Sequence, residues 1–488
     1  MADDWAFLER IYKLLRDEDV LATSPEASVV DFKFPDELAR IIDVSLDTKV
    51  SRTADEAEEI CRLVLRYSVK TGHRYFCNQL FGGCDVYGLA GAWITDALNT
   101  SQYTFEVAPV FTLIEDTIIR KCLELFNFSE GDGIFSPGGS MSNMYAMILA
   151  RFKVNPKFKC MGMFGSPPLV AFTSQDAHYS LKKAAHWMGI GLNNLEVVES
   201  DERGRMCPEA LKKAIVRVKE EGRRPFFVNA TAGTTVLGAF DDINALADVC
   251  QEAGVWLHLD ACLGGTAILS EKHKNLLRGS ERLNSLAWNP HKTLGAPLQC
   301  SILIVSGEKN LLHKCNCANA DYLFQQDKFY DISYDTGDKS FQCGRKVDSF
   351  KVWLMLKVRG VNELGLKVDN AMEMSQYLTN RLKSNSTFRL VLDEFQYTNI
   401  CFWYIPKSMR GQEETQEWWN TLYKVAPLIK EKMVKKGSMM VGFCPLPHKN
   451  VGNFFRMVIT CYPTLTRNDV DCFIAEIEQF GDSLDFPL

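Results

Sequence analysis

This sequence of 488 residues lacks the features that would direct a chain to a membrane, to nucleic acid or into the secretory route. No uninterrupted apolar run approaches the roughly 18–20 residues that cross a bilayer. The N-terminus, Met-Ala-Asp-Asp-Trp, is acidic and lacks the basic and then apolar pattern of a signal peptide. A net charge of −6, without a long Lys/Arg cluster, argues against a nucleic-acid binder. These absences predict a cytoplasmic protein that binds neither membrane nor nucleic acid.

Cysteine is too sparse and too irregularly spaced for a disulfide framework. The sixteen cysteines make up about 3% of the chain. In a protein that is not exported, such residues are expected to be reduced thiols, most of them small members of the core. Cys315 and Cys317 lie two positions apart but lack the second pair that would complete a zinc site. We therefore expect no disulfide scaffold and no metal.

The apolar residues form short runs whose spacing changes along the chain. In the first ~80 residues, apolar positions three and four apart predict amphipathic helices at 4–16 and 54–69. From about residue 86 to 344, short β-rich runs alternate with charged, helix-periodic segments such as 207–220 and 243–252. Near-continuous apolar strands between helices indicate a mainly parallel sheet covered on both faces. The predicted strands lie at 168–173, 195–198, 225–228, 255–259, 285–288 and 301–305.

The pattern changes again after about residue 346. A long helical stretch leads to a compact C-terminal part with strand-like runs at 399–405 and 454–460. We predict three parts: a helical N-terminal segment at 1–85, a large α/β domain at 86–345 and a small α+β domain at 346–488. The amphipathic helices of the first part need a partner, which a neighbouring domain or a second subunit would provide.

Two charged residues follow two of the predicted strands. Asp260 ends the apolar run 254–259, and Lys292 closes Trp-Asn-Pro-His-Lys after the run 283–288. Ligands of parallel sheets bind outside the carboxyl ends of the strands. An acid and a later lysine at such ends are what pyridoxal phosphate requires, because the lysine bonds the aldehyde and the carboxylate keeps the ring nitrogen protonated. Taken singly, Asp260 would be a helix cap or an ion-pair member and Lys292 a solvated lysine. Together they favour the cofactor, and His258 would support the site without contacting the cofactor itself.

A glycine-rich turn, Ser-Pro-Gly-Gly-Ser at 136–140, precedes a predicted helix at 141–151. Gly139 lets the backbone approach an anion, the helix start presents free N–H groups, and Ser140 adds a hydroxyl donor. By itself this is the pattern of an ordinary Ser-capped helix. Beside Asp260 and Lys292, it suits the cofactor's phosphate.

Two other strand ends carry polar groups. His178 follows the strand at 168–173, where an imidazole would stack on a flat pyridine ring, although a lone histidine is more often structural. Thr231 lies in Asn-Ala-Thr-Ala-Gly-Thr-Thr at 229–235, whose small side chains would approach the ring and its phenolic oxygen. The alternative for that segment is a common Thr/Gly turn.

Six ordered motifs resemble the group II pyridoxal-phosphate decarboxylases over about residues 67–457. They are similar to the branch of that family that acts on glutamate, cysteine sulfinate or aspartate. The motifs are Ser-Val-Lys-Thr-Gly-His at 68–73, Asn-Gln-Leu at 78–80, Pro-Gly-Gly-Ser at 137–140, Asn-Ala-Thr-Ala-Gly-Thr-Thr at 229–235, Trp-Asn-Pro-His-Lys at 288–292 and Phe-Gln-Gln-Asp-Lys at 324–328.

The resemblance implies the fold-type-I architecture, with a mainly parallel seven-stranded sheet flanked by helices, in an obligate homodimer whose active sites lie at the subunit interface. It implies that Lys292 bonds the cofactor, that Asp260 pairs with the ring nitrogen and that His178 stacks on the ring. Tyr330 matches a mobile-loop tyrosine that reprotonates the α-carbon. The implied cofactor-binding residues are Gly139, Ser140, His178, Thr231, Asp260, Ala261, Asn289, His291 and Lys292, and the implied substrate-binding residues are Gln79, Ser101, Gln102, Tyr103 and Arg456.

The chain departs from the family pattern at two places. The family often reads His-Val-Asp-Ala, then Ala or Ser, then Trp-Gly-Gly, whereas Cys262 and Leu263 follow Asp260-Ala261 here. Losing the tryptophan changes the local packing and the shape of the pocket but removes no required chemical group. The residues at 293–297 also vary from close relatives.

The segment at 99–104, Asn-Thr-Ser-Gln-Tyr-Thr, is similar to that of the cysteine-sulfinate and aspartate members. We therefore predict α-decarboxylation of cysteine sulfinate to hypotaurine, a step of taurine biosynthesis, ahead of aspartate to β-alanine and glutamate to GABA. Selectivity between acids that differ by one methylene amounts to only ~1–3 kcal/mol, so mixed activity is expected. Two other classes stay open: an aminotransferase, which shares the Asp and Lys logic, and a non-catalytic, cofactor-free dimer.

Overall fold

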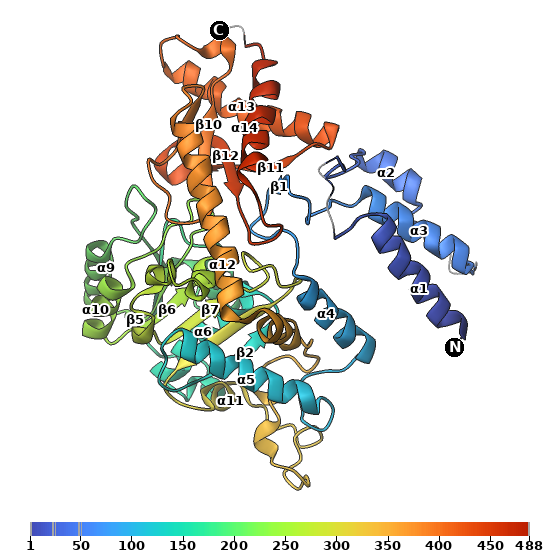
Figure 1. Cartoon of the computed structure of the whole chain (residues 1–488). Helices are drawn as coiled ribbons and strands as arrows, with labels where there is room; N and C mark the ends of the chain where they lie inside the picture. The colour runs from blue at the N-terminus through green and yellow to red at the C-terminus, as the bar shows by residue number, and fades with distance from the viewer. Residues whose placement is uncertain (1, 22–23, 25, 47–48, 50, 487–488) are drawn as a thin grey trace. The chain divides into compact units, whose positions relative to one another are not determined.

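The computed structural model describes residues 2–21, 24, 26–46, 49 and 51–486 (Figure 1). The chain forms two compact units. Unit 1 comprises Met1–Gly83, Ala371–Glu394 and Thr398–Leu488, and unit 2 comprises Cys84–Asn370 and Phe395–Tyr397. The three-part division at residues 85 and 345 stays a prediction. None of the helices in the described ranges combines the length and the apolarity that a bilayer span requires.

Unit 2 is built on a seven-stranded sheet with the strand order β2-β8-β7-β6-β5-β3-β4. Neighbouring strands from β7 to β4 pair in parallel, and β8 runs antiparallel to both β7 and β2. The predicted mainly parallel sheet is confirmed, and β2 is a strand that the apolar pattern did not reveal. The strands are β2 (Gly131–Ser136), β3 (Leu169–Ser174), β4 (Leu195–Val198), β5 (Arg224–Thr231), β6 (Trp256–Asp260), β7 (Ser285–Trp288) and β8 (Ser301–Ser306).

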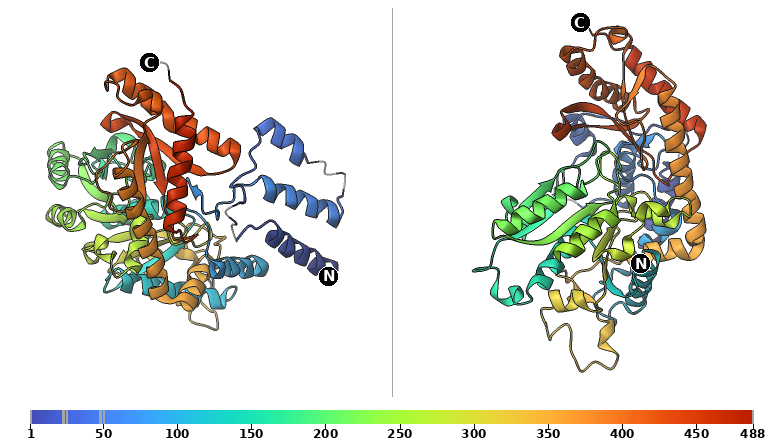
Figure 2. Two further views of the ribbon diagram at one scale, coloured as in Figure 1. Left: turned by 45° about the horizontal axis from the view of Figure 1, so that its top comes forward. Right: turned by 90° about the vertical axis from the view of Figure 1, so that its left-hand side faces the viewer.

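Helices flank this sheet, as Figure 2 shows for the green and yellow part of the chain. Their ends follow local capping chemistry: in α10 the Asp242 side chain accepts a hydrogen bond from the amide of Ala245, and the helix ends at Gly254 with φ 70°. The longest helix, α12, is broken at Gly360, where φ is 67°. The helices are α4 (Val86–Leu98), α5 (Pro109–Leu125), α6 (Gly139–Val154), α7 (Phe158–Met161), α8 (Ser180–Trp187), α9 (Pro208–Glu220), α10 (Ile243–Ala253), α11 (Leu311–Asn316) and α12 (Ser349–Lys383), whose last residues belong to unit 1.

The central strands are buried along most of their length, as expected for a sheet covered on both faces. Val170, Ala171 and Phe172 of β3 and Phe227 and Val228 of β5 have no exposed surface. The buried polar residues of these two strands, Thr173 and Ser174 in β3 and Asn229 and Thr231 in β5, lie towards their carboxyl ends. The register aligns these ends, because Thr231 of β5 lies opposite Asp260 of β6, and Asp260 opposite Ala287 of β7. The sheet therefore brings residues from distant parts of the sequence to one edge.

Unit 1 contains a five-stranded sheet with the order β1-β11-β12-β10-β9, in which only β1 pairs in parallel. Helices predicted at 4–16 and 54–69 are present as α1 and α3. A capping box starts α3: the side chains of Thr53 and Glu56 each accept a hydrogen bond from the other's amide. The elements are α1 (Ala2–Asp17), α2 (Pro35–Ile42), α3 (Ala54–Tyr67), β1 (Phe76–Cys77), β9 (Phe388–Leu390), β10 (Asn399–Tyr404), α13 (Gln416–Lys436), β11 (Met440–Leu446), β12 (Val451–Val458) and α14 (Arg467–Asp482).

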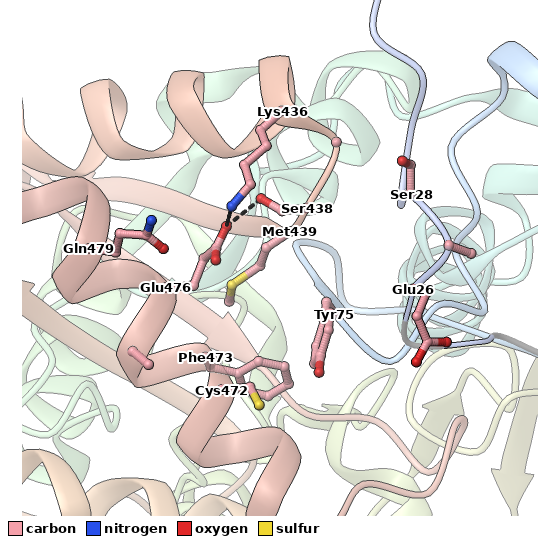
Figure 3. Close-up of a pocket in the computed structure, with 13 residues that line it drawn as sticks. Glu26, Ser28, Tyr75, Lys436, Ser438, Met439, Cys472, Phe473, Glu476 and Gln479 are labelled. Atoms are coloured by element: carbon pink, nitrogen blue, oxygen red, sulfur yellow. Dashed lines mark hydrogen bonds and ion pairs between the residues drawn. The ribbon is translucent and has the colours of Figure 1, made fainter.

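A hollow of about 480 Å³ lies within unit 1 and is drawn in Figure 3. Lys436 and Ser438 both point at Glu476 there: the ammonium lies 3.5 Å from the carboxylate, and the hydroxyl donates a hydrogen bond to it. Tyr75 and Phe473 also line the hollow. The charged side chains pair with one another, and none of the residues predicted for the site lines it.

Candidate active site

Asp260 is the buried acid at the end of β6. Its side chain accepts hydrogen bonds from the Asn143 amide nitrogen at 2.8 Å and from the Cys262 backbone amide at 3.1 Å. The residue is only 5% exposed. A carboxylate buried to this degree must be compensated by hydrogen bonds and by a nearby cation.

Lys292 supplies that positive charge. Burial alone would raise the pKa of Asp260, but the Lys292 ammonium, the hydrogen bonds from Cys262 and Asn143, and the His178 ring together lower that pKa below its ordinary value. His178 is influenced by the same two charges: burial lowers its pKa, Asp260 opposes that change and Lys292 adds to it. The structure therefore brings Asp260, Lys292 and His178 into one electrostatic environment, and Asp260 is ionised there.

The turn that carries Lys292 is fixed from the strand before it. Trp288 is 1% exposed at the end of β7, and its indole N–H donates to the Thr266 hydroxyl at 3.0 Å. The Lys292 amide donates to the Asn289 carbonyl at 3.0 Å, which closes the turn. The lysine is half-buried, unlike a freely solvated surface lysine.

The first turn of α6 has the features of an anion cradle. Gly138 has φ 105°, and a Cβ at Gly139 would clash with the Cys262 thiol and lie 2.8 Å from the Asn289 side-chain nitrogen. Helix starts present amides without intrahelical partners, and Ser140 is exposed in this turn. His291 Nδ1 lies 2.5 Å from the Cys300 carbonyl oxygen and 3.0 Å from the Cys300 amide nitrogen, so the Cys300 backbone orients the ring.

Polar side chains without a protein partner also gather at the carboxyl ends of β3 and β5. Among the described residues, the buried atoms Thr173 Oγ1, Ser174 Oγ and Asn229 Oδ1 have no hydrogen-bond partner. Thr231 is 3% exposed, and its amide donates to Asp241 at 2.7 Å. Ala261 is buried beside Asp260 and adds no bulk. This strand edge can hold a polar ring against small side chains.

Comparison with known proteins identifies this arrangement. Residues 35–405 match the family model described as the pyridoxal-dependent decarboxylase conserved domain. The chain belongs to this family. The decarboxylase is 48% identical over 480 residues to a Mus musculus protein named cysteine sulfinic acid decarboxylase, covering 98% of this chain and 96% of that one. It is also 48% identical to the acidic amino acid decarboxylase GADL1 of Homo sapiens, covering 98% and 91% of the two chains.

Solved structures of related decarboxylases also match the fold of this chain. The crystal structure of mouse CSAD in apo form matches with a TM-score of 0.95 and 46% identity, covering 99% of this chain and all of that one. The Oryza sativa TDC structure with PLP and tryptamine, at 20% identity and a TM-score of 0.87, shares the fold. The expected fold, the pyridoxal phosphate cofactor and the carboxy-lyase class are confirmed. The family separates the decarboxylase from the aminotransferase and cofactor-free alternatives.

The predicted substrate residues at 101–103 pack within unit 2. Gln102 has no exposed surface: its side-chain nitrogen donates to the Phe111 carbonyl at 2.9 Å, and its side-chain oxygen accepts from Ser349 at 3.2 Å. Arg345 forms a buried ion pair with Glu115 and donates to the Gln102 carbonyl at 2.8 Å. A substrate would have to replace one of these bonds to reach the Gln102 amide.

The residues on either side of Gln102 are also tied to the segment around Arg345. The Ser101 hydroxyl accepts from the Arg345 amide at 3.0 Å. The Tyr103 carbonyl accepts from the Gly337 amide at 2.7 Å. Ser101 and Tyr103 are half-buried, so their side chains are more accessible to a substrate than that of Gln102.

Gln79 and Arg456 belong to unit 1. The Arg456 guanidinium, on β12, donates to the Asn78 carbonyl at 3.3 Å, and Gln79 is exposed immediately after Asn78. Lys430 of α13 donates to the Asn78 side chain at 2.6 Å, and its pKa is lowered by burial and by the charge of Arg456. Unit 1 therefore assembles two cations around the Asn-Gln-Leu motif.

Tyr330 lies in the segment after α11 that projects from unit 2, drawn in gold in Figure 1. Its hydroxyl donates to Asp335 at 3.0 Å and accepts from the Glu106 amide at 3.3 Å. Lys328 donates to the other Asp335 oxygen at 2.9 Å, and the Phe105 ring lies 5.2 Å from the Tyr330 ring. In this conformation local partners hold the tyrosine hydroxyl.

Three residues that matter here escaped the sequence analysis. Asn143 was treated as part of an ordinary amphipathic helix, although it lies one turn beyond Gly139 on a side otherwise occupied by apolar residues. Ser285 begins an apolar strand and gives little signal. Lys430 has the spacing of a solvated helix residue, and nothing in the sequence connects it with Asn78.

The buried His258 and the half-buried His291 predict how stability depends on pH. Burial lowers the pKa of His258 to about 4 and that of His291 to about 4, from an ordinary value of 6.5. Between these values the unfolded chain binds protons that the folded chain does not. The free energy of unfolding is therefore unaffected by protonation of these two histidines above pH 6.5. As the pH falls towards 4 it decreases by about 1.4 kcal/mol per pH unit for each histidine.

We expect the urea midpoint of the apoprotein to fall between pH 7 and pH 5, and His291→Gln to reduce that fall. His448→Gln, at an exposed site, is the matched control and should leave the pH dependence unchanged. An equal pH dependence in wild type and His291→Gln would show that His291 does not titrate on unfolding.

Proposed function

We propose that this decarboxylase converts cysteine sulfinate to hypotaurine, with aspartate to β-alanine and glutamate to GABA as slower reactions. The observation that carries the chemistry is the buried, ionised Asp260 within electrostatic reach of Lys292 at the sheet edge. The choice of substrate is supported by the mouse relative, which is named for cysteine sulfinic acid and is 48% identical over 98% of this chain.

When bound, pyridoxal phosphate supplies an aldehyde for covalent attachment and a ring that accepts the electrons released at the substrate's α-carbon. Lys292 provides the amine for that attachment. The ionised Asp260 would hold a proton at the ring nitrogen, which would strengthen electron withdrawal by the ring. His178 would cover one face of the ring and exclude water.

The remaining site residues would bind the cofactor's phosphate, bind the substrate or transfer a proton. Gly139 and Ser140 would offer the phosphate the first amides of α6 and a hydroxyl, and the His291 ring would lie beside it from the β7–β8 segment. The Arg456 guanidinium would bind the substrate carboxylate bidentately. Tyr330 would leave Asp335 and protonate the α-carbon. Thr231, Ala261 and Asn289 would line the ring, and Gln79, Ser101, Gln102 and Tyr103 would line the acidic side chain.

We infer that the enzyme works as a cytoplasmic homodimer. Trp5, Leu8 and Tyr12 lie three and four residues apart on α1 and are 70%, 55% and 58% exposed. An exposed apolar stripe of this kind is typical of an interface that another chain covers. All sixteen cysteines are free thiols, which fits a reducing compartment and can be checked by cell fractionation.

Direct competition among the three acids tests the proposed substrate. We expect cysteine sulfinate to give the highest kcat/KM. Glutamate, whose side chain is one methylene longer, should be lower by roughly 10- to 200-fold, because one methylene in a pocket is worth about 1–3 kcal/mol. Aspartate, which carries a carboxylate in place of the sulfinate, should also be lower. Hypotaurine, β-alanine and GABA would be quantified together with carbon dioxide. Preference for glutamate would contradict the substrate assignment, and keto acid without carbon dioxide would contradict decarboxylation.

Lys292→Ala tests the attachment point. The variant should lose the visible absorbance of the covalently held cofactor and nearly all turnover, because the substitution removes the amine that is proposed to bond the aldehyde. Lys182→Ala, which removes an exposed lysine on α8, is the matched control and should retain both. A yellow, fully active Lys292→Ala protein would refute the assignment.

Mixing two defective subunits tests the homodimer and Tyr330 together. Lys292→Ala subunits should be inactive, and Tyr330→Phe subunits should bind cofactor but release amine slowly or divert product to aldehyde. If the Tyr330 loop serves the partner's site, a doubly tagged heterodimer of the two regains one intact site and about half of the wild-type activity.

Failure of the two tags to copurify would exclude the dimer. Heterodimer activity no higher than that of the Tyr330→Phe parent would place Tyr330 in its own subunit's site. An unchanged rate and product ratio in Tyr330→Phe alone would remove the tyrosine from the mechanism.

A further inference from the structure

A chain of polar side chains runs through the interior of unit 2 and ends at Asp260. The Trp256 indole N–H donates to the Ser285 hydroxyl at 2.9 Å, and that hydroxyl lies 2.8 Å from His258 Nδ1. His258 Nε2 lies 3.0 Å from the Asn143 side-chain oxygen. The Asn143 side-chain nitrogen donates to Asp260 at 2.8 Å. The chain therefore links β7, β6 and α6 to the buried acid.

The chemistry of the groups fixes the direction of every bond. The indole of Trp256 can only donate, so the Ser285 oxygen accepts there. The Asn143 nitrogen donates to Asp260 and, at 3.0 Å, to the Ser180 hydroxyl, so its oxygen must accept from His258 Nε2–H. In a neutral His258 the Nδ1 atom then has a lone pair, and it accepts the Ser285 proton. Every donor in the chain points towards Asp260.

The reversed chain is inconsistent with an ionised acid. Turning the Asn143 amide over would place its oxygen 2.8 Å from the Asp260 oxygen, which is tolerable only if Asp260 carries a proton. It would also require His258 to present a lone pair at Nε2. The direction of the bonds and the ionisation of Asp260 are therefore coupled.

Burial makes this coupling strong. His258 and Ser285 have no exposed surface and Asn143 has 1%, so water does not replace a broken bond cheaply. Burial also lowers the pKa of His258 to about 4, which keeps the ring neutral at physiological pH. A neutral ring has one donor, Nε2–H, and one acceptor, Nδ1, so His258 can accept from Ser285 and donate to Asn143 at the same time.

We propose that Ser285, His258 and Asn143 form a directional relay that orients the Asp260 carboxylate, keeps it ionised and so strengthens binding of the cofactor's protonated ring nitrogen. These three are positioning residues, since none of them is assigned a contact with cofactor or substrate. The proposal rests on the proposed role of Asp260 towards the ring. With the amides of Asn143 and Cys262 occupied at the carboxylate, the remaining lone pairs are left for that contact.

The tautomer of His258 can be measured without cofactor. Solid-state NMR of apoprotein containing histidine labelled with 15N at Nδ1, with the signal assigned by its loss in His258→Gln, should show an unprotonated Nδ1 from about pH 6 to about pH 8. A protonated Nδ1 in the wild type would overturn the relay whatever reaction the enzyme catalyses.

Cofactor affinity supplies the second measurement. Ser285→Ala should weaken binding of pyridoxal phosphate to the apoprotein roughly tenfold, and Asn143→Asp, which sets a second carboxylate beside Asp260, by roughly a hundredfold, the range typical of outer-shell partners. Ser285→Thr keeps the hydroxyl and should restore both the affinity and the tautomer. Equilibrium dialysis of apoprotein against pyridoxal phosphate gives these values without turnover.

A buried serine outside the chain offers a matched control. Ser375 is 3% exposed, and its hydroxyl donates to the Ala371 carbonyl at 2.8 Å within α12. Ser375→Ala should therefore leave the affinity unchanged, and an equal loss in Ser375→Ala and Ser285→Ala would overturn the relay in favour of a general packing effect. Wild-type affinity in both Ser285→Ala and Asn143→Asp would also overturn it. Wild-type apoprotein that takes up no pyridoxal phosphate would instead contradict the proposed function.

Discussion

The rest of the structure depends on a negative charge kept inside the protein. Burying an ionised carboxylate costs several kcal/mol unless hydrogen bonds and an opposite charge compensate it. At Asp260 two amides and the Lys292 ammonium do so strongly enough to lower the pKa despite burial. Parallel pairing makes this possible, because β6 and β7 end side by side and the turn after Trp288 carries Lys292 to the edge where Asp260 lies. The sheet register thus brings together an acid and a lysine that lie 32 positions apart in the sequence.

Features that depend on short segments could be predicted from the sequence. The apolar runs located most strands of the seven-stranded sheet, and the Asp260 and Lys292 motifs predicted the cofactor. Roles that depend on a distant partner could not be predicted. Asn143 lies 117 positions from Asp260, and Lys430 lies 352 from Asn78, so no local pattern connects them. The strand β2 was missed because Gly-Asp-Gly at its start lacks the apolar alternation that marks a strand.

The residues assigned to the substrate differ in how easily the protein can release them. The half-buried Tyr330 hydroxyl is held by Asp335 and Glu106 in a segment that projects from unit 2. The bond to the Glu106 amide contributes only about 0.5–1.5 kcal/mol and the bond to the Asp335 carboxylate about 1.5–3 kcal/mol, and Asp335 keeps Lys328 as a partner when the tyrosine leaves. Gln102 is fully buried, and both ends of its amide are bonded next to the Arg345–Glu115 ion pair. Freeing it would leave buried groups unsatisfied, at about 1–3 kcal/mol for each. Tyr330 therefore suits a side chain that moves during the reaction, whereas Gln102 suits a fixed wall.

Main-chain contacts explain why the chain can depart from the family pattern next to Asp260. Cys262 contributes its backbone amide to Asp260, and its thiol packs against Gly139. The amide is present whatever side chain stands at this position, so the hydrogen bond does not depend on cysteine. The thiol does restrict its neighbour, because a Cβ at Gly139 would clash with it. Leu263 is likewise buried, and its carbonyl accepts from the Thr293 hydroxyl at 3.4 Å. The loop after β6 thus keeps Asp260 and the Lys292 turn in place mainly through its main chain, and substitutions at 262 and 263 change the packing around the ring more than the groups that act on it.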